Sequence, residues 1–139
     1  VRLEENGLVS ALEELAESTA SFFSTQCRFS CEAPVPIRNH TVAHHLYFIA
    51  HEAILNAVKH GKARSIKVRL SPVNGEGCIL SVCDDGIGLG KVSPQAKGMG
   101  IRIMNYRARI IGGELQVGPA PGGGTEVACR LSGETRSTG

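Results

Sequence analysis

The chain has 139 residues, of which 42% are hydrophobic and 20% charged, and its formal net charge is +2. This length fits one domain with its own core, and the scattered Lys and Arg residues argue against a dedicated nucleic-acid surface. We expect a soluble domain, because no run approaches the roughly 18 apolar residues of a membrane span and the start, VRLEENG, lacks a signal peptide's apolar segment.

The first half of the chain predicts a helix, a short strand and a longer helix. Residues 8–23 place apolar side chains on one helical stripe, namely Leu8, Leu12, Leu15, Thr19 and Phe22. The strand is expected at Thr25–Glu32, followed by a proline-stiffened connection at Ala33–Asn39. The longer helix also has one apolar face, formed by Leu46, Ile49, Ala50, Ala53, Ile54, Ala57 and Val58.

The second half predicts two hairpins separated by a third helix. SIKVRL and CILSVCDD flank the turn PVNGEG, and ELQV and TEVACRL flank PAPGGG. Between them, IRIMNYRARII has helical periodicity and ends at Gly112–Gly113. Hairpins grouped apart from helices predict an α/β (α+β) two-layer sandwich: a mixed, mostly antiparallel sheet with the helices on one face. We expect this domain to cover residues 1–132, with a flexible tail at 133–139.

The five cysteines are an odd number without a CxxC pair. They therefore indicate reduced core residues in a cytosolic protein rather than a disulfide framework or a zinc site. Cys83, beside Asp84, is expected to be one of these core residues.

The long helix carries a second, polar stripe: Glu52, Asn56, Lys59 and His60. A solvated helix surface would explain this stripe by itself. Three glycine-bearing stretches follow it, DDGIGLG, KGMG and PGGGTE, and ordinary turns would also explain each of these alone. No glycine precedes Lys-Ser or Lys-Thr as in a P-loop, and GIGLG has the wrong spacing for a dinucleotide fingerprint.

Taken together, the stripe and the glycines suit an adenine nucleotide lying between a sheet and a helix. Asp84, at the end of a strand, can accept a hydrogen bond from the adenine amino group. Gly86 and Gly88 allow the backbone to approach the base, and Gly98 and Gly100 are expected to open the third helix, whose free amides can meet phosphates. The amide oxygen of Asn56 can bind magnesium.

These segments resemble the ATP-binding superfamily of gyrase, heat-shock chaperone, histidine kinase and mismatch-repair ATPases, which has the Bergerat fold. HEAILNAVKHG resembles its N box, DDGIG its first glycine box, KGMGIRIMNYRARIIGG its second, and PGGGTEV its closing segment. The resemblance covers nearly the whole chain. The pattern of the second glycine box is most similar to sensor histidine kinases of the nitrate-sensor and LuxR-regulator-coupled type.

The resemblance implies roles for individual residues. Asp84 would bind adenine beside Gly86, Gly88 and Thr125, and Asn56 would hold Mg²⁺. Lys59 and His60 would lie near the sugar and phosphates, while Gly98 and Gly100 would belong to a lid over the phosphates. Glu52 stands where hydrolysing relatives keep a catalytic acid. His51 takes a position where relatives commonly have glutamine.

The implied activity is that of a protein histidine kinase, which transfers the γ-phosphoryl group of ATP to histidine and then to a response regulator. The dimerisation hairpin that carries the phosphorylated histidine is missing here, so we expect a cytoplasmic catalytic domain whose parent kinase has the hairpin before Val1. Such a domain would not autophosphorylate alone, and would contact neither nucleic acid nor membrane directly. An anti-sigma-factor-like serine kinase of the same fold is the alternative.

Overall fold

The computed structural model of the chain describes residues 6–35, 37, 39–73, 77–88 and 94–132, with the backbone alone described for Asn6 and for residues 94–98. The predicted tail at 133–139 lies outside this part. The described elements are, in order, α1 (Asn6–Phe23), β1 (Gln26–Ser30), α2 (His40–Lys59), β2 (Ser65–Val73), β3 (Gly77–Asp84), α3 (Pro94–Ile110), β4 (Glu114–Pro119) and β5 (Thr125–Leu131). None of the described helices is both long and apolar enough to cross a membrane.

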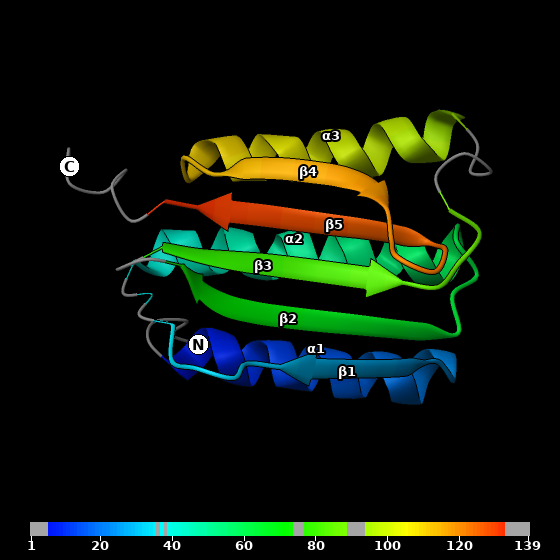
Figure 1. Cartoon of the computed structure of the whole chain (residues 1–139), viewed down its shortest axis with the longest axis horizontal. Coiled ribbons are helices and arrows are strands. Elements are labelled where there is room, and N and C mark those ends of the chain that lie inside the picture. The colour runs from blue at the N-terminus through cyan, green and yellow to red at the C-terminus, as the bar shows by residue number, and fades with distance from the viewer. Residues whose placement is uncertain (1–5, 36, 38, 74–76, 89–93, 133–139) are drawn as a thin grey trace.

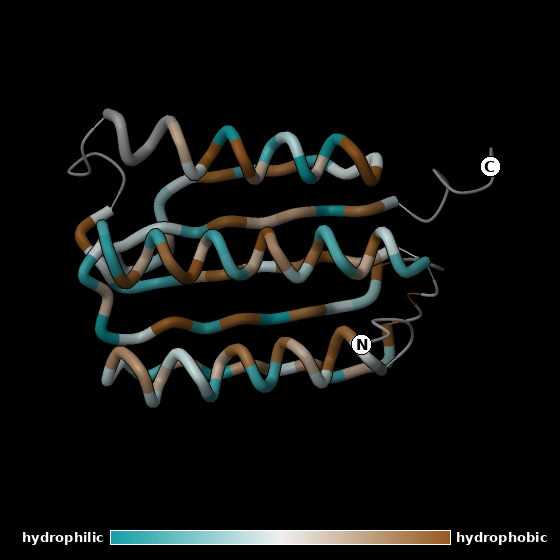
Figure 2. Tube along the Cα trace, turned by 180° about the vertical axis from the view of Figure 1, so that it is seen from behind, coloured by the Kyte–Doolittle hydropathy of each residue, from teal (hydrophilic) through white to brown (hydrophobic). Residues whose placement is uncertain are grey.

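The strands form one sheet in the order β1-β2-β3-β5-β4 (Figure 1). β1 runs parallel to β2, and every other pairing is antiparallel. The helices lie behind the sheet in Figure 1 and in front of it in Figure 2, which is seen from the opposite side. The predicted two-layer sandwich is therefore confirmed.

The sheet buries one face because its central strands alternate. Ile66, Val68 and Leu70 of β2 are at most 2% exposed, whereas Lys67 and Arg69 between them are exposed on the other face. Each fully buried aliphatic side chain contributes about 1.5–3 kcal/mol relative to an exposed one. This alternation is what holds the sheet against the helices.

The central helix α2 supplies most of the opposing layer. Its buried residues are Ala43, Leu46, Ile49, Ala50, Ala53, Ile54 and Ala57. The side chain of Asn39 caps its start by accepting hydrogen bonds from the amides of Thr41 at 2.8 Å and Val42 at 3.2 Å. In α1 the buried stripe is Leu8, Leu12, Ala16 and Thr19, and Phe22, which was predicted to share it, is 81% exposed. The stripe instead continues to the half-buried Phe23.

Strand β2 runs two residues into the segment predicted as a turn. Pro72 cannot donate to a neighbouring strand, but β1 ends opposite Arg69, so β2 has no partner on that side at Pro72. A proline is therefore tolerated there. The last residue of the predicted turn, Gly77, begins β3, and residues 74–76 lie outside the described part.

Helix α3 begins at Pro94, whereas the sequence predicted a start at Ile101. Proline is favoured in the first turn of a helix, where its missing amide costs nothing. Glycine inside a helix costs about 1 kcal/mol relative to alanine, which is why Gly98 and Gly100 suggested a loop. Gly100 is buried, however, and a tertiary contact described below requires its small size.

The predicted core location is confirmed for three of the cysteines. Cys27, Cys78 and Cys129 are buried, and burial raises their pKa values to about 11, 12 and 11. Cys31 is half-buried. The prediction for Cys83 was wrong: it is half-buried and points away from the helices, because successive side chains of a strand alternate and Asp84 points towards them. Burial and the neighbouring Glu126 carboxylate raise the pKa of the Cys83 thiol.

The loop between β4 and β5 contains three consecutive glycines with positive φ. They are Gly122 (83°), Gly123 (110°) and Gly124 (89°). A Cβ on Gly124 would lie 2.7 Å from the carbonyl carbon of Asp84, whereas a Cβ on Gly122 would meet nothing within 4 Å. Of these two glycines, Gly124 contacts the end of β3 and Gly122 does not.

These two glycines predict different costs of substitution. Gly122→Ala should lower the free energy of unfolding by about 1–2 kcal/mol, the cost of left-handed backbone for alanine. Gly124→Ala adds a clash with the Asp84 backbone and should cost about 3 kcal/mol or more. Urea denaturation of both variants measures the difference, and equal losses would contradict the close contact.

Candidate functional site

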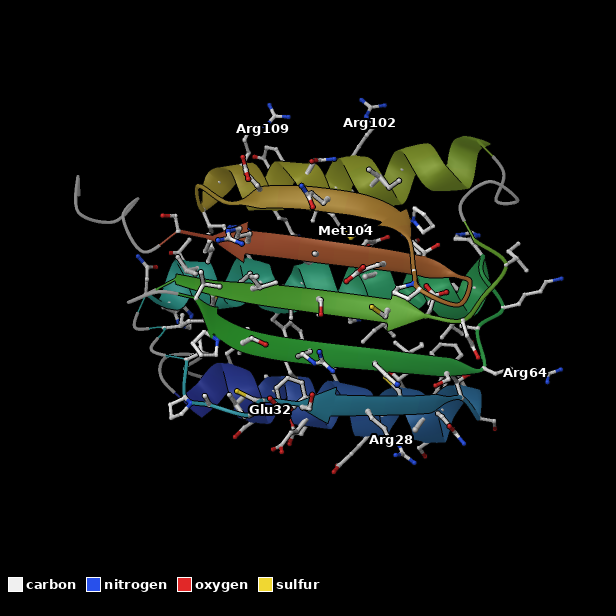
Figure 3. The ribbon with its side chains drawn as sticks, viewed as in Figure 1. Arg28, Glu32, Arg64, Arg102, Met104 and Arg109 are labelled. Carbon is white, nitrogen blue, oxygen red and sulfur yellow. The ribbon has the colours of Figure 1, made fainter. Side chains whose placement is uncertain are left out.

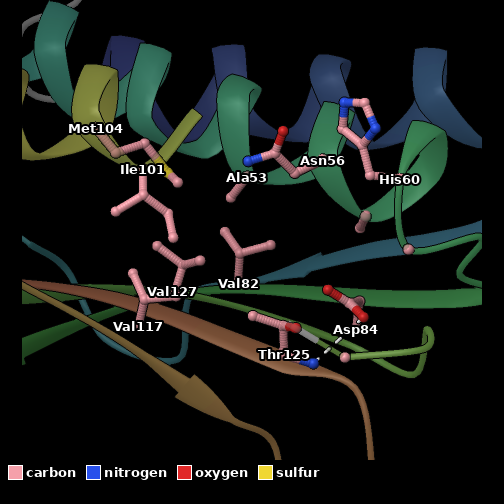
Figure 4. Close-up of a pocket in the computed structure, with 13 residues that line it drawn as sticks. Ala53, Asn56, His60, Val82, Asp84, Ile101, Met104, Val117, Thr125 and Val127 are labelled. Carbon is pink, nitrogen blue, oxygen red and sulfur yellow. Dashed lines mark hydrogen bonds between the residues drawn. The ribbon is translucent and has the colours of Figure 1, made fainter. Parts of the chain in front are cut away.

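A small cavity lies between the sheet and the helices α2 and α3 (Figure 4). Its volume is about 30 Å³, which is room for about one water molecule. The residues that line it are Ala53, Asn56, Ala57, His60, Gly61, Val82, Asp84, Gly88, Ile101, Met104, Val117, Thr125 and Val127.

The cavity has an apolar end and a polar end (Figure 4). Val82, Val117 and Val127 rise from the sheet towards Ile101 and Met104 of α3. At the other end, Asp84 and Thr125 of the sheet face Asn56 of α2, and His60, which follows the last residue of α2, lines the cavity with its ring pointing away from the sheet. A flat, largely apolar group with polar edges suits this arrangement.

Asp84 is the carboxylate of the cavity, because it is the last residue of β3 and shares the helix-facing side with Val82. Its Oδ1 accepts hydrogen bonds from the amides of Gly86 at 2.7 Å and Thr125 at 3.4 Å. Burial raises the pKa of Asp84, and these two bonds offset part of the shift. Among the described residues none donates to Oδ2, so this oxygen can accept from a ligand.

Asp85, next along the chain, fixes the loop instead of lining the cavity. Its Oδ1 accepts from the amides of Arg64 at 2.8 Å and Ser65 at 2.9 Å. Its own amide donates to the carbonyl of Ser65 at 3.2 Å. These hydrogen bonds hold the pKa of Asp85 below its usual range. Asp85 thus ties the end of β3 to the start of β2, and sequence reasoning did not find this role.

Gly86 allows two backbones to meet. A Cβ there would lie 2.9 Å from the carbonyl carbon of Gly61, just past the end of α2, and the next amide, of Ile87, donates to the Gly61 carbonyl at 2.9 Å. Gly86 was predicted to line the ligand's base, but it does not line the cavity. Gly88, with φ of 87°, does line it.

The stripe of α2 that faces the cavity is Ala53, Asn56, Ala57 and His60. Glu52 and Lys59 lie further round the helix, because one residue turns the direction by about 100°. Glu52 is half-buried and Lys59 is exposed, and neither lines the cavity. Of the four predicted polar residues of this helix, the structure therefore brings Asn56 and His60 into the site.

The second turn of α3 lies directly on Asn56. A Cβ on Gly100 would be 2.9 Å from the Asn56 side-chain oxygen. The prediction that Gly98 and Gly100 open this helix with free amides was wrong, because from Gly98 onward each amide can bond the carbonyl four residues earlier. The surroundings of Gly98 lie outside the described part.

The sequence did not predict that Ile101 and Met104 line the site. Ile101 and Met104 were assigned to the apolar stripe of the third helix, and helical periodicity does not distinguish a core contact from a cavity lining. Their side chains reach the cavity because α3 runs alongside β4 on the helix side of the sheet (Figure 1).

Comparison with known proteins gives a family and a fold. The family described as "Histidine kinase-, DNA gyrase B-, and HSP90-like ATPase" matches residues 41–135. The nitrate/nitrite sensor protein NarQ of Escherichia coli (strain K12) is 32% identical over 126 residues, covering 91% of this chain and 22% of NarQ. The sensor histidine kinase NarS of Mycobacterium tuberculosis is 33% identical over 132 residues, covering 93% of this chain and 30% of NarS. The chain thus spans less than a third of the length of these curated relatives.

Among solved structures, the ATP-binding domain of PrrB from Mycobacterium tuberculosis superposes with a TM-score of 0.67 at 22% identity, over 89% of this chain and 92% of that one. The likeness supports the two-layer fold. Together with the family match, it confirms the resemblance inferred from the sequence.

The two bonds at Asp85 predict a selective effect on stability. Asp85→Ala removes the acceptor for two amides and should lower the free energy of unfolding by about 1 kcal/mol. Asp85→Asn keeps an oxygen acceptor and should lose less.

Lowering the pH should also remove the contribution of Asp85 to the free energy of unfolding. Because the folded pKa of Asp85 lies below its usual 3.8, its stabilisation is present above pH 3.8 and is lost as pH falls through the lower folded value. Thermal unfolding at pH 7 and at pH 3 or below compares the unaltered chain with Asp85→Asn, which cannot titrate at this position. A difference between the two that persists unchanged in acid would contradict this role.

Proposed function

Because the chain belongs to the family of histidine kinase-, DNA gyrase B- and HSP90-like ATPases, we propose that it is the ATP-binding catalytic domain of a sensor histidine kinase. The observation that carries the proposal is that Asp84 of the sheet and Asn56 of α2 line one cavity from opposite sides. In the parent kinase the domain presents Mg-ATP to a histidine of a separate dimerisation hairpin. A response regulator then receives the phosphoryl group.

Adenine occupies the cavity floor in this proposal. Oδ2 of Asp84 accepts a hydrogen bond from the adenine amino group while Oδ1 keeps its bonds to the backbone. Val82 and Met104 contact the two faces of the base, and Gly88 and Thr125 lie at its edge. Gly86 acts indirectly, by letting the Asp84 loop approach α2.

Asn56 and His60 lie where the sugar and phosphates would extend from the base. The neutral oxygen of Asn56 fits magnesium, which takes few protein ligands and keeps water and phosphate oxygens around it. When bound, magnesium neutralises charge on the phosphates. We assign Lys59 to the phosphates from the exposed side of α2, and Gly98 and Gly100 to the covering segment above them. Glu52 is the candidate for orienting the phosphoacceptor histidine.

ATP needs more space than the described cavity offers. Sites for ligands of this size enclose roughly 300–1,000 Å³, against about 30 Å³ here. The floor consists of paired strands and α2 covers the polar end, whereas Ile101 and Met104 of α3 cover the apolar end, with Gly100 of the same helix resting against Asn56. Binding therefore requires this half of α3 to move away from the sheet and from Asn56.

The outer face of α3 offers a docking surface for the hairpin. Four large apolar side chains lie at helical spacing and are unusually exposed: Met99 (68%), Ile103 (39%), Tyr106 (66%) and Ile110 (45%). Apolar side chains in such a row mark interaction surfaces. This stripe and the cavity roof belong to the same helix, so a hairpin docked here would lie beside the bound nucleotide.

The nucleotide site is tested with Asp84→Asn. Gly86 already donates to Oδ1, so the Asn oxygen stays there and its NH₂ group faces the adenine NH₂ group, donor against donor. We expect ATP affinity to fall about 10- to 100-fold. Calorimetry with and without magnesium measures it, with Asp85→Asn as the neighbouring control. Unchanged affinity in Asp84→Asn would refute the adenine site.

The docking surface is tested with Tyr106→Asp and Ile103→Asp. Both should retain ATP affinity, because neither residue lines the cavity, and both should slow phosphorylation of a supplied hairpin at least about tenfold. Phe22→Asp, at an exposed apolar residue on α1, is the control and should leave the rate unchanged. Equal rates in all three variants would exclude the stripe.

A further inference from the structure

Beyond the cavity, Arg107 of α3 contacts two side chains of α2. Nη1 of Arg107 lies 3.0 Å from Nδ1 of His45, and its guanidinium carbon stands 4.8 Å from the centre of the Phe48 ring. Arg107 follows Met104 by three residues, so it lies one helical turn beyond the cavity roof.

We propose that Arg107 is a positioning residue for nucleotide binding: by joining α3 to His45 and Phe48 of α2, it anchors the helix one turn beyond the cavity roof, so that the roof half can move aside for the nucleotide while α3 stays on α2. The inference rests on the proposed nucleotide site. The part of α3 over the cavity is intrinsically weak, since Gly98 and Gly100 each cost about 1 kcal/mol of helix stability relative to alanine. Its placement therefore depends on contacts made elsewhere along the same helix.

Arginine is suited to this contact in a way that lysine is not. The guanidinium lies over the Phe48 ring while its Nη1 contacts Nδ1 of His45. A lysine ammonium can form one of these contacts but has no flat face for the other. Arg102 and Arg109 of the same helix point away from the molecule (Figure 3) and are exposed. They provide matched controls.

The contact also requires neutral His45. A guanidinium only donates hydrogen bonds, so Nδ1 of His45 must accept and its proton must sit on Nε2. The charged and titratable groups that act on His45 are Arg107 of α3 and His44 of α2. Burial, followed by Arg107 and His44, lowers the pKa of His45 from its usual 6.5. The contact is therefore complete above pH 6.5 and is lost as pH falls through the lower folded pKa.

The first arm of the test compares arginine variants in the full chain. Arg107→Met and Arg107→Lys should bind a fluorescent ATP analogue with magnesium about tenfold more weakly, as expected when a hydrogen bond to a charged group is lost. Arg102→Met and Arg109→Met should bind like the unaltered chain. Circular dichroism checks that each variant is folded.

The second arm separates positioning through His45 from mere packing. His45→Asn keeps an acceptor close to the Nδ1 position but cannot be protonated, so it should bind normally at pH 7.5. The unaltered chain should lose more affinity than this variant between pH 7.5 and pH 5.

Normal binding by folded Arg107→Met and Arg107→Lys would overturn the inference, as would identical pH profiles for His45→Asn and the unaltered chain. If Arg107→Met fails to fold, Arg107→Lys and the His45→Asn profile decide. If Asp84→Asn loses binding while the arginine variants do not, the nucleotide site stands and the role of Arg107 fails. If the unaltered chain binds no nucleotide, the proposed function fails first.

Discussion

The site depends on the close approach of three stretches of backbone around Asp84. Gly124 lies on the carbonyl of Asp84, Gly86 lies on the end of α2 at Gly61, and the amides of Gly86 and Thr125 both donate to the Asp84 carboxylate. None of these approaches leaves room for a side chain. The carboxylate is thus held by the main chain, and its orientation does not depend on the rotamers of neighbouring side chains.

Two adjacent aspartates show how strand geometry separates roles. Asp84 turns towards the helices, where burial raises its pKa, and Asp85 turns outward, where backbone amides lower its pKa. One residue is left with an oxygen for a ligand, and the other closes the loop that holds the first in place. Two aspartates with the same side chain therefore take different places: Asp84 lines the cavity, and Asp85 supports the loop that follows it.

Periodicity in the sequence was enough to predict the two layers, both hairpins and the residues on each side of the long helix. The pairing of Asp84 with Asn56 followed from the motifs, as did their common location between sheet and helix. What periodicity missed depends on contacts between elements. The start of α3 depends on Gly100 resting against Asn56, and the length of β2 depends on where β1 stops. The contact between Arg107 and His45 joins residues 62 positions apart, and no local sequence pattern predicts it.

The layering has a consequence for how the molecule can respond to a ligand. Most of the floor of the cavity is made by β3 and β5, which are paired on both sides within the sheet. Over its apolar end the roof is α3, which is held by side-chain contacts: Met104 and Ala108 pack in the core, and Arg107 reaches α2. The sheet is held by hydrogen bonds between its strands, whereas α3 is held by side-chain contacts. The cavity can therefore widen for a ligand by movement of α3 while the hydrogen bonds of the sheet stay intact.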